Sequence, residues 1–235
     1  MKNTLQHYSS VLFKSDQRGS TDDGGFRCFS TFNYKTYQQA GREPFGALQF
    51  FNDDYLAPGQ QLSAKYENFA ELIIPVTGTA IFNAMEIRSE QKILFSGEKT
   101  SSYTIQNRHE KEWINFLHIG LKLQRPLPSG QFTIENIRLE KINRLTTINL
   151  EENNSGIYGY IGVYEGRAKE TYRIRKKGNG VFIYIINGAF EAENRLMEHR
   201  DGLSLWNIET IDFEALAAHS IVLLLEFPLH DFLTA

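Results

Sequence analysis

The chain has 235 residues, of which 41% are hydrophobic, 23% charged and 13% aromatic, and its formal net charge is -3. This length suits one large domain or two domains of about 100 to 120 residues each. The slightly acidic balance lacks the basic face that nucleic-acid-binding proteins carry. No apolar run approaches the roughly 18 residues of a membrane span. We therefore expect neither direct nucleic-acid binding nor insertion into a membrane.

The cysteine content favours a reducing compartment. Cys28 is the single cysteine, so no internal disulfide can form. The first ten residues also lack the apolar segment of a secretory signal. We expect a cytoplasmic protein in which Cys28, set in an alternating aromatic strand, is a buried small residue and not a nucleophile.

Aromatic residues favour strands over helices in this chain. It holds 17 Phe and 11 Tyr but only three Met, and aromatic side chains suit a pleated, half-buried surface. Candidate strands recur along the first half, at 26–34, 49–51, 71–76, 80–83, 92–95, 103–106 and 113–123. Short strands with regular turns predict a sandwich or a barrel.

A connection follows at 125–130, where two prolines and a glycine interrupt the strand pattern. Residues 131–155 are expected to hold linking strands. The strand pattern then resumes at Gly156, with hairpin dipeptides at Asn179-Gly180 and Asn187-Gly188. The segment 181–188 parallels 72–78, because each is an apolar strand that ends in a polar-glycine turn. One short helix is possible, at 211–218.

Several motifs resemble those of one family, the pirin-like proteins, which are two-domain members of the cupin superfamily. In the first half the resemblance rests on an Arg-Gly pair, an Asn-Asp-Asp triplet and an Ala-Pro-Gly turn, at 18–19, 52–54 and 57–59, together with 45–48. In the second half it rests on 201–206 and 225–228. The resemblance implies an all-β protein with two tandem cupin-type (jelly-roll) β-barrels. We place the N-terminal barrel at 1–125 and the C-terminal barrel at 126–235, with linking strands at 126–155.

The resemblance also implies where a metal would bind. Typical family members hold iron or another divalent metal in the first barrel through three histidines and one glutamate, a donor set that leaves positions open for substrate or dioxygen. Counting from the Ala-Pro-Gly turn and from Asn107 puts these positions on Lys65, Glu67, Tyr103 and Ile105. A protonated Lys and an Ile offer no lone pair. We therefore predict that the metal site is lost and that the chain carries no cofactor.

The six histidines are scattered, and none forms a His-x-His or His-x-x-x-His motif. His118 lies on a candidate inward-facing strand, so it is a possible neighbour of the pocket. The alternatives for it are a hydrogen-bonded core histidine and an outward-facing one. The carboxylates of Asp53 and Asp54 are adjacent in a strand and must face opposite ways.

We expect the former metal positions to form a polar floor in the first barrel. If Lys65 and Glu67 both point inward, their charged ends can pair with the Tyr103 hydroxyl, because unpaired buried charges are costly. Such a floor could bind a small anionic or phenolic ligand, or it could merely fill the barrel. A Lys65→Met variant would distinguish these two interpretations.

The leading hypothesis is thus a pirin-like bicupin without the family metal site, acting as a non-enzymatic small-ligand-binding or protein-interaction protein, with no catalytic residue assigned. The alternative is a metal-dependent quercetinase-type dioxygenase with a rebuilt site that uses Glu67, His118 and a third residue that the sequence does not identify. A third hypothesis, a transcription-linked partner protein, rests on analogy with eukaryotic relatives alone.

Overall fold

The structure is a computed structural model that describes residues 9–65, 69–96, 102–123, 132–139, 141–150 and 156–229. Within these ranges every regular element is a β-strand except one short 3-10 helix, η1 (Ser15–Gln17). The all-β prediction is therefore confirmed. The described residues fall into two compact units: one lies within 18–138, and the other draws on 9–17, 139, 141–150 and 156–229.

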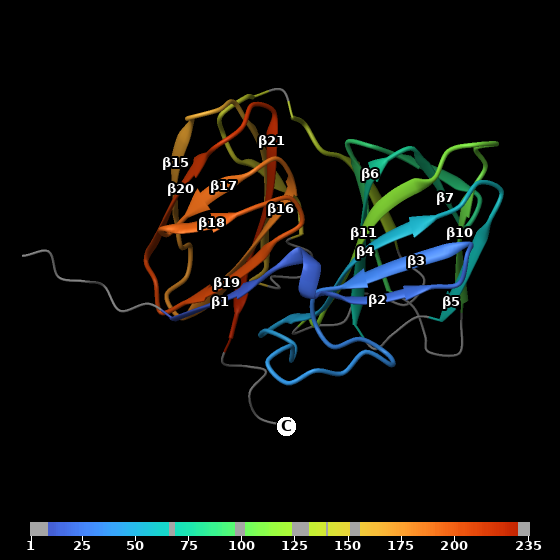
Figure 1. Cartoon of the computed structure of the whole chain (residues 1–235), viewed down its shortest axis with the longest axis horizontal. Helices are drawn as coiled ribbons and strands as arrows, with labels where there is room; N and C mark the ends of the chain where they lie inside the picture. The colour runs from blue at the N-terminus through green and yellow to red at the C-terminus, as the bar shows by residue number, and fades with distance from the viewer. Residues whose placement is uncertain are drawn as a thin grey trace, which may run out of the picture. The chain divides into compact units, whose positions relative to one another are not determined.

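The N-terminal barrel is formed by Arg18–Arg138 and has two antiparallel sheets (Figure 1). The larger sheet has the strand order β12-β9-β6-β11-β4-β3-β2, and the smaller has the order β5-β10-β7-β8. The strands are β2 (Gly19–Asp22), β3 (Phe26–Ser30), β4 (Leu48–Leu56), β5 (Gln61–Lys65), β6 (Ala70–Thr77), β7 (Thr79–Phe82), β8 (Met85–Arg88), β9 (Gln91–Phe95), β10 (Ser102–Asn107), β11 (Ile114–Leu121) and β12 (Phe132–Asn136).

The C-terminal barrel repeats this plan, with a six-stranded sheet in the order β1-β19-β16-β21-β14-β13 and a four-stranded sheet in the order β15-β20-β17-β18. Its strands are β1 (Ser9–Phe13), β13 (Thr146–Ile148), β14 (Tyr158–Tyr164), β15 (Lys169–Arg173), β16 (Asn179–Asn187), β17 (Phe190–Ala192), β18 (Arg195–Met197), β19 (Gly202–Trp206), β20 (Thr210–Ala215) and β21 (Ser220–Pro228).

Side-chain patterns explain which strands are central and which are peripheral. Strands β5 and β10 alternate between more exposed and more buried residues, which is typical of a sheet with one face toward solvent. Strand β11 is buried along its whole length, as is most of β6, β16 and β21. These are the continuous apolar runs of the sequence. Each barrel encloses its own apolar core.

Two glycines occupy equivalent turns in the two barrels and support the internal repeat. Gly78 follows β6 with a φ of 77°, and Gly188 follows β16 with a φ of 79°. A Cβ at Gly78 would lie 2.6 Å from Ile114 Cγ2, and one at Gly188 would lie 2.1 Å from Ser220 Oγ. Only glycine meets both the backbone and the space requirement there.

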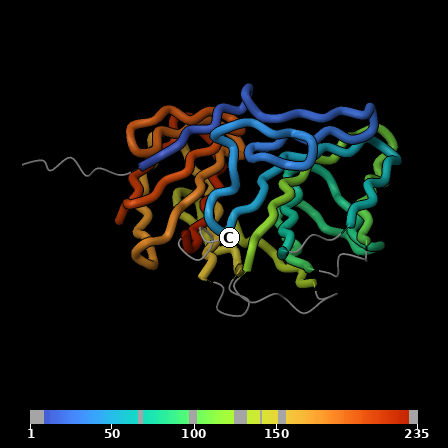
Figure 2. Tube along the Cα trace, turned by 90° about the horizontal axis from the view of Figure 1, so that it is seen from below, coloured from blue at the N-terminus to red at the C-terminus, as the bar shows by residue number. Residues whose placement is uncertain are grey.

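Strand β1 belongs to the C-terminal barrel. The division of the chain therefore differs from the predicted one, which placed all residues before 126 in the N-terminal barrel. Strand β1 pairs with β19 along its whole length (Figure 2). The following turn is held by the buried carboxylate of Asp201, which lies 2.5 Å from Lys14 Nζ and accepts a hydrogen bond from Ser15 N. The linking strand β12, placed in the C-terminal half, pairs instead with β9 of the N-terminal barrel.

Two local predictions in the C-terminal half are wrong. The segment 211–218 forms no helix, because Thr210–Ala215 is strand β20 with alternating burial. The Asn179-Gly180 pair lies inside β16, and the positive φ of the preceding turn falls on Gly178. No helix in the described part of the chain is long and apolar enough to cross a membrane.

Candidate functional site

Polar side chains gather on the inner face of the larger sheet of the N-terminal barrel. On β4, Asn52 and Asp54 share a face with Leu56, which belongs to the barrel core. The register sets Asn52 between Ser30 of β3 and His118 of β11. One part of the barrel interior is therefore apolar, whereas another carries several buried polar groups.

Glu71, Tyr103 and His118 meet inside the barrel although they come from three different strands. The Tyr103 hydroxyl donates to Glu71 Oε2 at 2.8 Å, and His118 Nε2 lies 2.7 Å from the same oxygen. All three residues are at most 3% exposed. Burial, and next the Glu71 carboxylate, raise the pKa of the Tyr103 phenol well above its usual value, so Tyr103 is a neutral donor.

A second carboxylate lies at the other nitrogen of the same imidazole. His118 Nδ1 is 3.4 Å from Asp54 Oδ2, and both side chains are buried. Burial alone would lower the pKa of His118, but the hydrogen bonds and charges of Asp54 and Glu71 outweigh it and raise the pKa to about 9. His118 is therefore an imidazolium at neutral pH, with both ring nitrogens protonated.

A cavity of about 150 Å³ opens beside this cluster. Its walls include Phe26, Tyr34, Leu62 and Ala64, and its polar inner end includes Asp54, His118, Cys28 and Ser30. The segment Lys35–Tyr37, with Gly19–Thr21 of β2, lines the rest of it. A Cβ at Gly19 would lie 2.3 Å from the ring of Tyr37, so glycine is needed for this ring to pack on β2.

Two polar groups near the inner end have hydrogen-bonding capacity left over. Asp54 is 1% exposed, yet its Oδ1 accepts no hydrogen bond within the described residues. Neither amide atom of the fully buried Asn52 has a partner there either. Unsatisfied buried polar groups are costly and require an explanation, of which a bound ligand or an ordered water is the simplest.

The structure corrects one of the predicted site residues and places the others. Lys65 is exposed, because β5 directs Leu62 and Ala64 toward the interior instead. Glu67 lies outside the described residues. Tyr103 and Ile105 are buried in the barrel core, and neither is among the residues that line the cavity. His118 is hydrogen bonded in the interior and also lines the cavity.

The neighbouring carboxylates Asp53 and Asp54 face opposite sides of β4, as predicted. Asp53 Oδ2 lies 3.1 Å from Arg18 Nη1, and its Oδ1 accepts a hydrogen bond from Asn115. This ion pair joins the Arg-Gly pair to the Asn-Asp-Asp triplet, two motifs that lie far apart in sequence. Cys28 is buried beside Asp54, and burial together with this carboxylate raises the pKa of the thiol, so Cys28 is not a reactive thiolate.

Glu71 and Asp54 were not identified from the sequence as members of the buried cluster around His118. The available signal was the alternation of side chains along a strand, in which residues two apart lie on the same face. Asp54 lies two residues before the inward Leu56, and Glu71 lies two residues before the inward Ile73. A charged residue at an inward position of a strand needs a buried partner. His118 is the partner of both.

The side chains that the structure describes around His118 leave few lone pairs for a metal ion. Both nitrogens of His118 are directed at carboxylates and carry protons, so neither offers a lone pair. Ile105 has no donor atom, and Leu62 and Ala64 occupy the inward positions of β5. Across the ranges that the structure describes, no three His, Cys, Asp or Glu side chains are grouped so that they could hold a metal ion.

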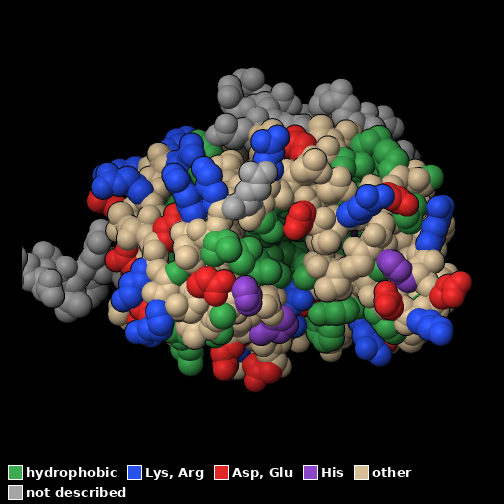
Figure 3. Space-filling model, turned by 90° about the horizontal axis from the view of Figure 1, so that it is seen from above, with side chains coloured by type: hydrophobic (Ala, Val, Ile, Leu, Met, Phe, Trp, Pro, Cys, Tyr) green, Lys and Arg blue, Asp and Glu red, His purple; other side chains and the backbone are tan. Residues whose placement is uncertain are grey.

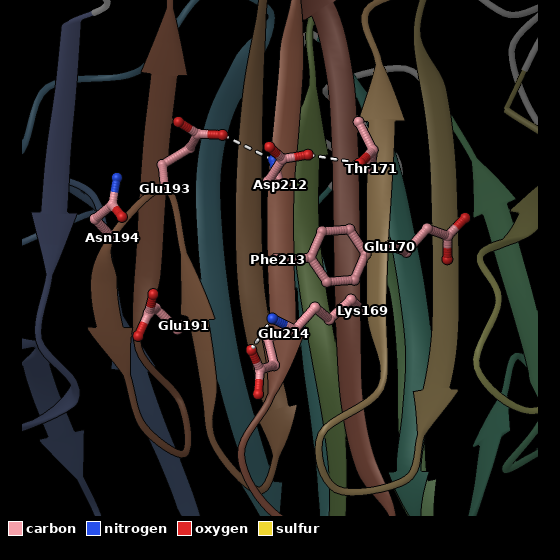
Figure 4. A pocket seen from close by; sticks show the side chains of 9 residues that line it. All are labelled: Lys169, Glu170, Thr171, Glu191, Glu193, Asn194, Asp212, Phe213 and Glu214. Carbon is pink, nitrogen blue, oxygen red and sulfur yellow. Dashed lines mark hydrogen bonds and ion pairs between the residues drawn. The ribbon is translucent and has the colours of Figure 1, made fainter. Parts of the chain in front are cut away.

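A larger hollow of about 410 Å³ lies on the C-terminal barrel, over β15, β17 and β20 (Figure 4). Three of its acidic side chains have partners: Lys169 Nζ lies 2.9 Å from Glu214, Thr171 donates to Asp212, and Glu193 accepts from the Asp212 backbone N–H. Lys169, Thr171, Glu191 and Asp212 are exposed. This hollow lies on the outer face of a sheet, and acidic side chains outnumber basic ones in its lining.

Comparison with known proteins finds a family model that matches part of the C-terminal barrel. Residues 144–227 match a family model described as the quercetinase C-terminal cupin domain. No curated protein matches the sequence.

Solved structures show the same fold over nearly the whole chain. YhhW from Escherichia coli has a TM-score of 0.80 and 18% identity, over 94% of this chain and 98% of its own. A bacterial pirin YhhW in complex with nickel(II), also from Escherichia coli, has a TM-score of 0.81, 18% identity and coverages of 94% and 99%. A quercetin 2,3-dioxygenase from Acinetobacter baumannii has a TM-score of 0.68, 13% identity and coverages of 94% and 86%.

Proposed function

We propose that this chain is a pirin-like bicupin and that it binds a small organic molecule in its N-terminal barrel without the help of a metal ion. The observation that carries the proposal is the position of His118, whose two ring nitrogens lie between Asp54 and Glu71. A buried imidazolium in this place supplies the positive charge that a metal ion would otherwise bring to two buried carboxylates.

The cavity next to the cluster gives the proposal its binding site. Ligand pockets are concave and mostly apolar, with a few polar groups that orient the ligand. The N-terminal cavity has this composition, with apolar walls and the unpaired Asp54 Oδ1 at its inner end. The role we propose is non-enzymatic binding, and the lost metal site and absent cofactor are parts of the same proposal.

The choice of a small molecule as partner also rests on charge. The net charge is -3, and Lys, Arg, Asp and Glu side chains are interspersed on the face drawn in Figure 3. Nucleic acids and anionic membranes select basic surfaces, so we propose neither as a partner. We propose a cytoplasmic location because the single cysteine has no need of an oxidising compartment.

A second candidate function is a metal-dependent quercetinase-type dioxygenase with a rebuilt site. The family match of residues 144–227 favours it, because the matched model is a quercetinase domain. This second function would require His118 to break its contact with either Asp54 or Glu71 and to lose a proton. The freed nitrogen would then ligate a metal together with Glu67.

Metal content separates the two functions. Untagged protein is incubated without oxygen with Fe(II) or Ni(II), desalted and analysed by inductively coupled plasma mass spectrometry. We expect much less than one metal ion per chain. One ion per chain that disappears in His118→Ala but persists in His219→Ala, a change at an exposed histidine of the other barrel, would contradict the metal-free proposal and support the dioxygenase.

A further inference from the structure

The charges around the N-terminal cavity indicate which kind of ligand it accepts. Asp54 and Glu71 contribute two negative charges, and the His118 imidazolium contributes one positive charge. Lys35 lines the cavity near its mouth, with its ammonium 4.9 Å from the centre of the Tyr34 ring. The charges around the cavity therefore sum to zero before any ligand binds.

Hydrogen-bonding capacity adds a second constraint. Asp54 Oδ2 faces His118 Nδ1 at 3.4 Å, and a carboxylate paired in this way offers its other oxygen, Oδ1, as an acceptor. A ligand group at this oxygen must therefore donate a hydrogen bond. A ligand carboxylate or phosphate would instead bring a second acceptor into repulsive contact with Asp54 Oδ1. An ammonium group would be separated from the His118 cation only by the Asp54 carboxylate, so the two positive charges would repel each other.

Size is the third constraint. Pockets for drug-sized ligands measure about 300 to 1,000 Å³, whereas this cavity measures about 150 Å³. The aromatic and aliphatic walls, Phe26, Tyr34, Leu62 and Ala64, suit a compact hydrocarbon body. A ligand with several fused rings would not fit inside.

We propose that the N-terminal cavity selects small, uncharged, compact alcohols, whose apolar body fills the cavity and whose O–H donates to Asp54 Oδ1. This inference rests on the proposed metal-free binding function and names the ligand class of the same site. It departs from the anionic ligand that the sequence left open, because that ligand was matched to an inward Lys65 and Lys65 is exposed.

The test uses four probes with the same ring: cyclohexanol, methylcyclohexane, cyclohexanecarboxylate and cyclohexylammonium. Dissociation constants for the full chain are measured by NMR titration in the wild type and three variants. Asp54→Asn removes the charged acceptor, Ala64→Trp fills the cavity, and Asp212→Asn makes the same chemical change as Asp54→Asn at an exposed position of the other barrel.

We expect cyclohexanol to bind at least tenfold more tightly than each of the other probes, since a hydrogen bond to a charged group contributes about that factor. Asp54→Asn should reduce the preference over methylcyclohexane to about threefold or less, because a neutral amide oxygen is a weaker acceptor. Ala64→Trp should abolish binding of all four probes, whereas Asp212→Asn should leave the constants unchanged. Circular dichroism verifies that each variant is folded.

Three results would overturn the ligand class: tighter binding of the carboxylate or the ammonium, equal binding of methylcyclohexane, or an unchanged preference in Asp54→Asn. In the first two cases the cavity still binds a small molecule, so the proposed function stands. If none of the probes binds, the ligand class fails, and the metal measurement decides the proposed function on its own.

Discussion

His118 and Glu71 face each other across the paired strands β11 and β6, with Nε2 of the imidazole 2.7 Å from Oε2 of the carboxylate. Glu71 also accepts the Tyr103 hydroxyl, and Asp54 lies at the opposite ring nitrogen. The stability of the barrel should therefore depend on the protonation of one buried side chain.

The two tryptophans allow each barrel to be followed separately. Trp113 precedes β11 in the N-terminal barrel, and Trp206 ends β19 in the C-terminal barrel. In a Trp206→Phe background, tryptophan fluorescence reports unfolding of the N-terminal barrel alone. A Trp113→Phe background reports the C-terminal barrel in the same way.

Stability of the N-terminal barrel should fall as the pH rises from neutral into the alkaline range. The pKa of His118 is raised from 6.5 to about 9 on folding, so its contribution is complete below about pH 6.5 and is lost as pH rises through 9. The full contribution is about 3 kcal/mol. Urea unfolding of the Trp206→Phe protein at pH 6, 7.5 and 9 measures the decline. The matched His118→Gln protein should lack this slope, and equal slopes would show that His118 is not the titrating group.

Removing the Tyr103 hydroxyl should destabilise the N-terminal barrel. Tyr103→Phe leaves the Glu71 carboxylate with one donor fewer, and hydrogen bonds to buried charged groups contribute about 2 kcal/mol. We expect a loss of this size in urea unfolding. Tyr37→Phe is the control, because the Tyr37 hydroxyl bonds Gln39 at an exposed position and should contribute less than about 0.5 kcal/mol. Similar losses in the two variants would contradict the buried network.

The orientation of β5 predicts opposite behaviour for two of its residues. Lys65 is exposed, so Lys65→Met should change the free energy of unfolding by less than about 0.5 kcal/mol. Leu62 packs against the core and lines the cavity, so Leu62→Lys should cost about 2 kcal/mol and prevent ligand binding. Urea unfolding in the Trp206→Phe background compares the two. A large effect at position 65 with none at 62 would mean that the strand is turned over.

Glu226 should be indispensable to the C-terminal barrel. This fully buried carboxylate accepts hydrogen bonds from the Tyr172 hydroxyl, the Asn179 amide and the backbone N–H groups of Arg175 and Lys176. Glu226→Ala leaves these donors without their acceptor, and we expect a loss of about 3 kcal/mol or more.

The Trp113→Phe background isolates this measurement. Glu191→Ala provides the control, since Glu191 is exposed on β17 and should change stability by less than about 0.5 kcal/mol. A loss in Glu226→Ala no larger than in this control would rule out the anchoring role.

The sequence predicts much of the first barrel because its signals are local. The expected strands 49–51, 71–76 and 103–106 all lie within observed strands, β4, β6 and β10, since apolar alternation and turn residues act over a few residues. The error at Lys65 has a local cause too. Counting forward from the Ala-Pro-Gly turn assigned the inward-facing positions of β5 one residue away from their true place. A shift of one residue exchanges the two faces of a strand.

Other features required information from distant parts of the chain. The approach of Asp54 and Glu71 to the same imidazole depends on the register of β11 with both β4 and β6. No motif in the sequence specifies that register. The strands β1 and β19 are even further apart in the sequence. A domain boundary drawn from proline and glycine content could not reveal that they pair.

The pairing of β1 with β19 has a consequence for biosynthesis. The residues of β1 are synthesised long before those of their partner strand β19, so the second barrel cannot close until β19 has been made. Until then the residues of β1 have no strand to pair with. A protease that removed these few residues from the nascent chain would therefore damage the C-terminal barrel, whose other strands are synthesised much later.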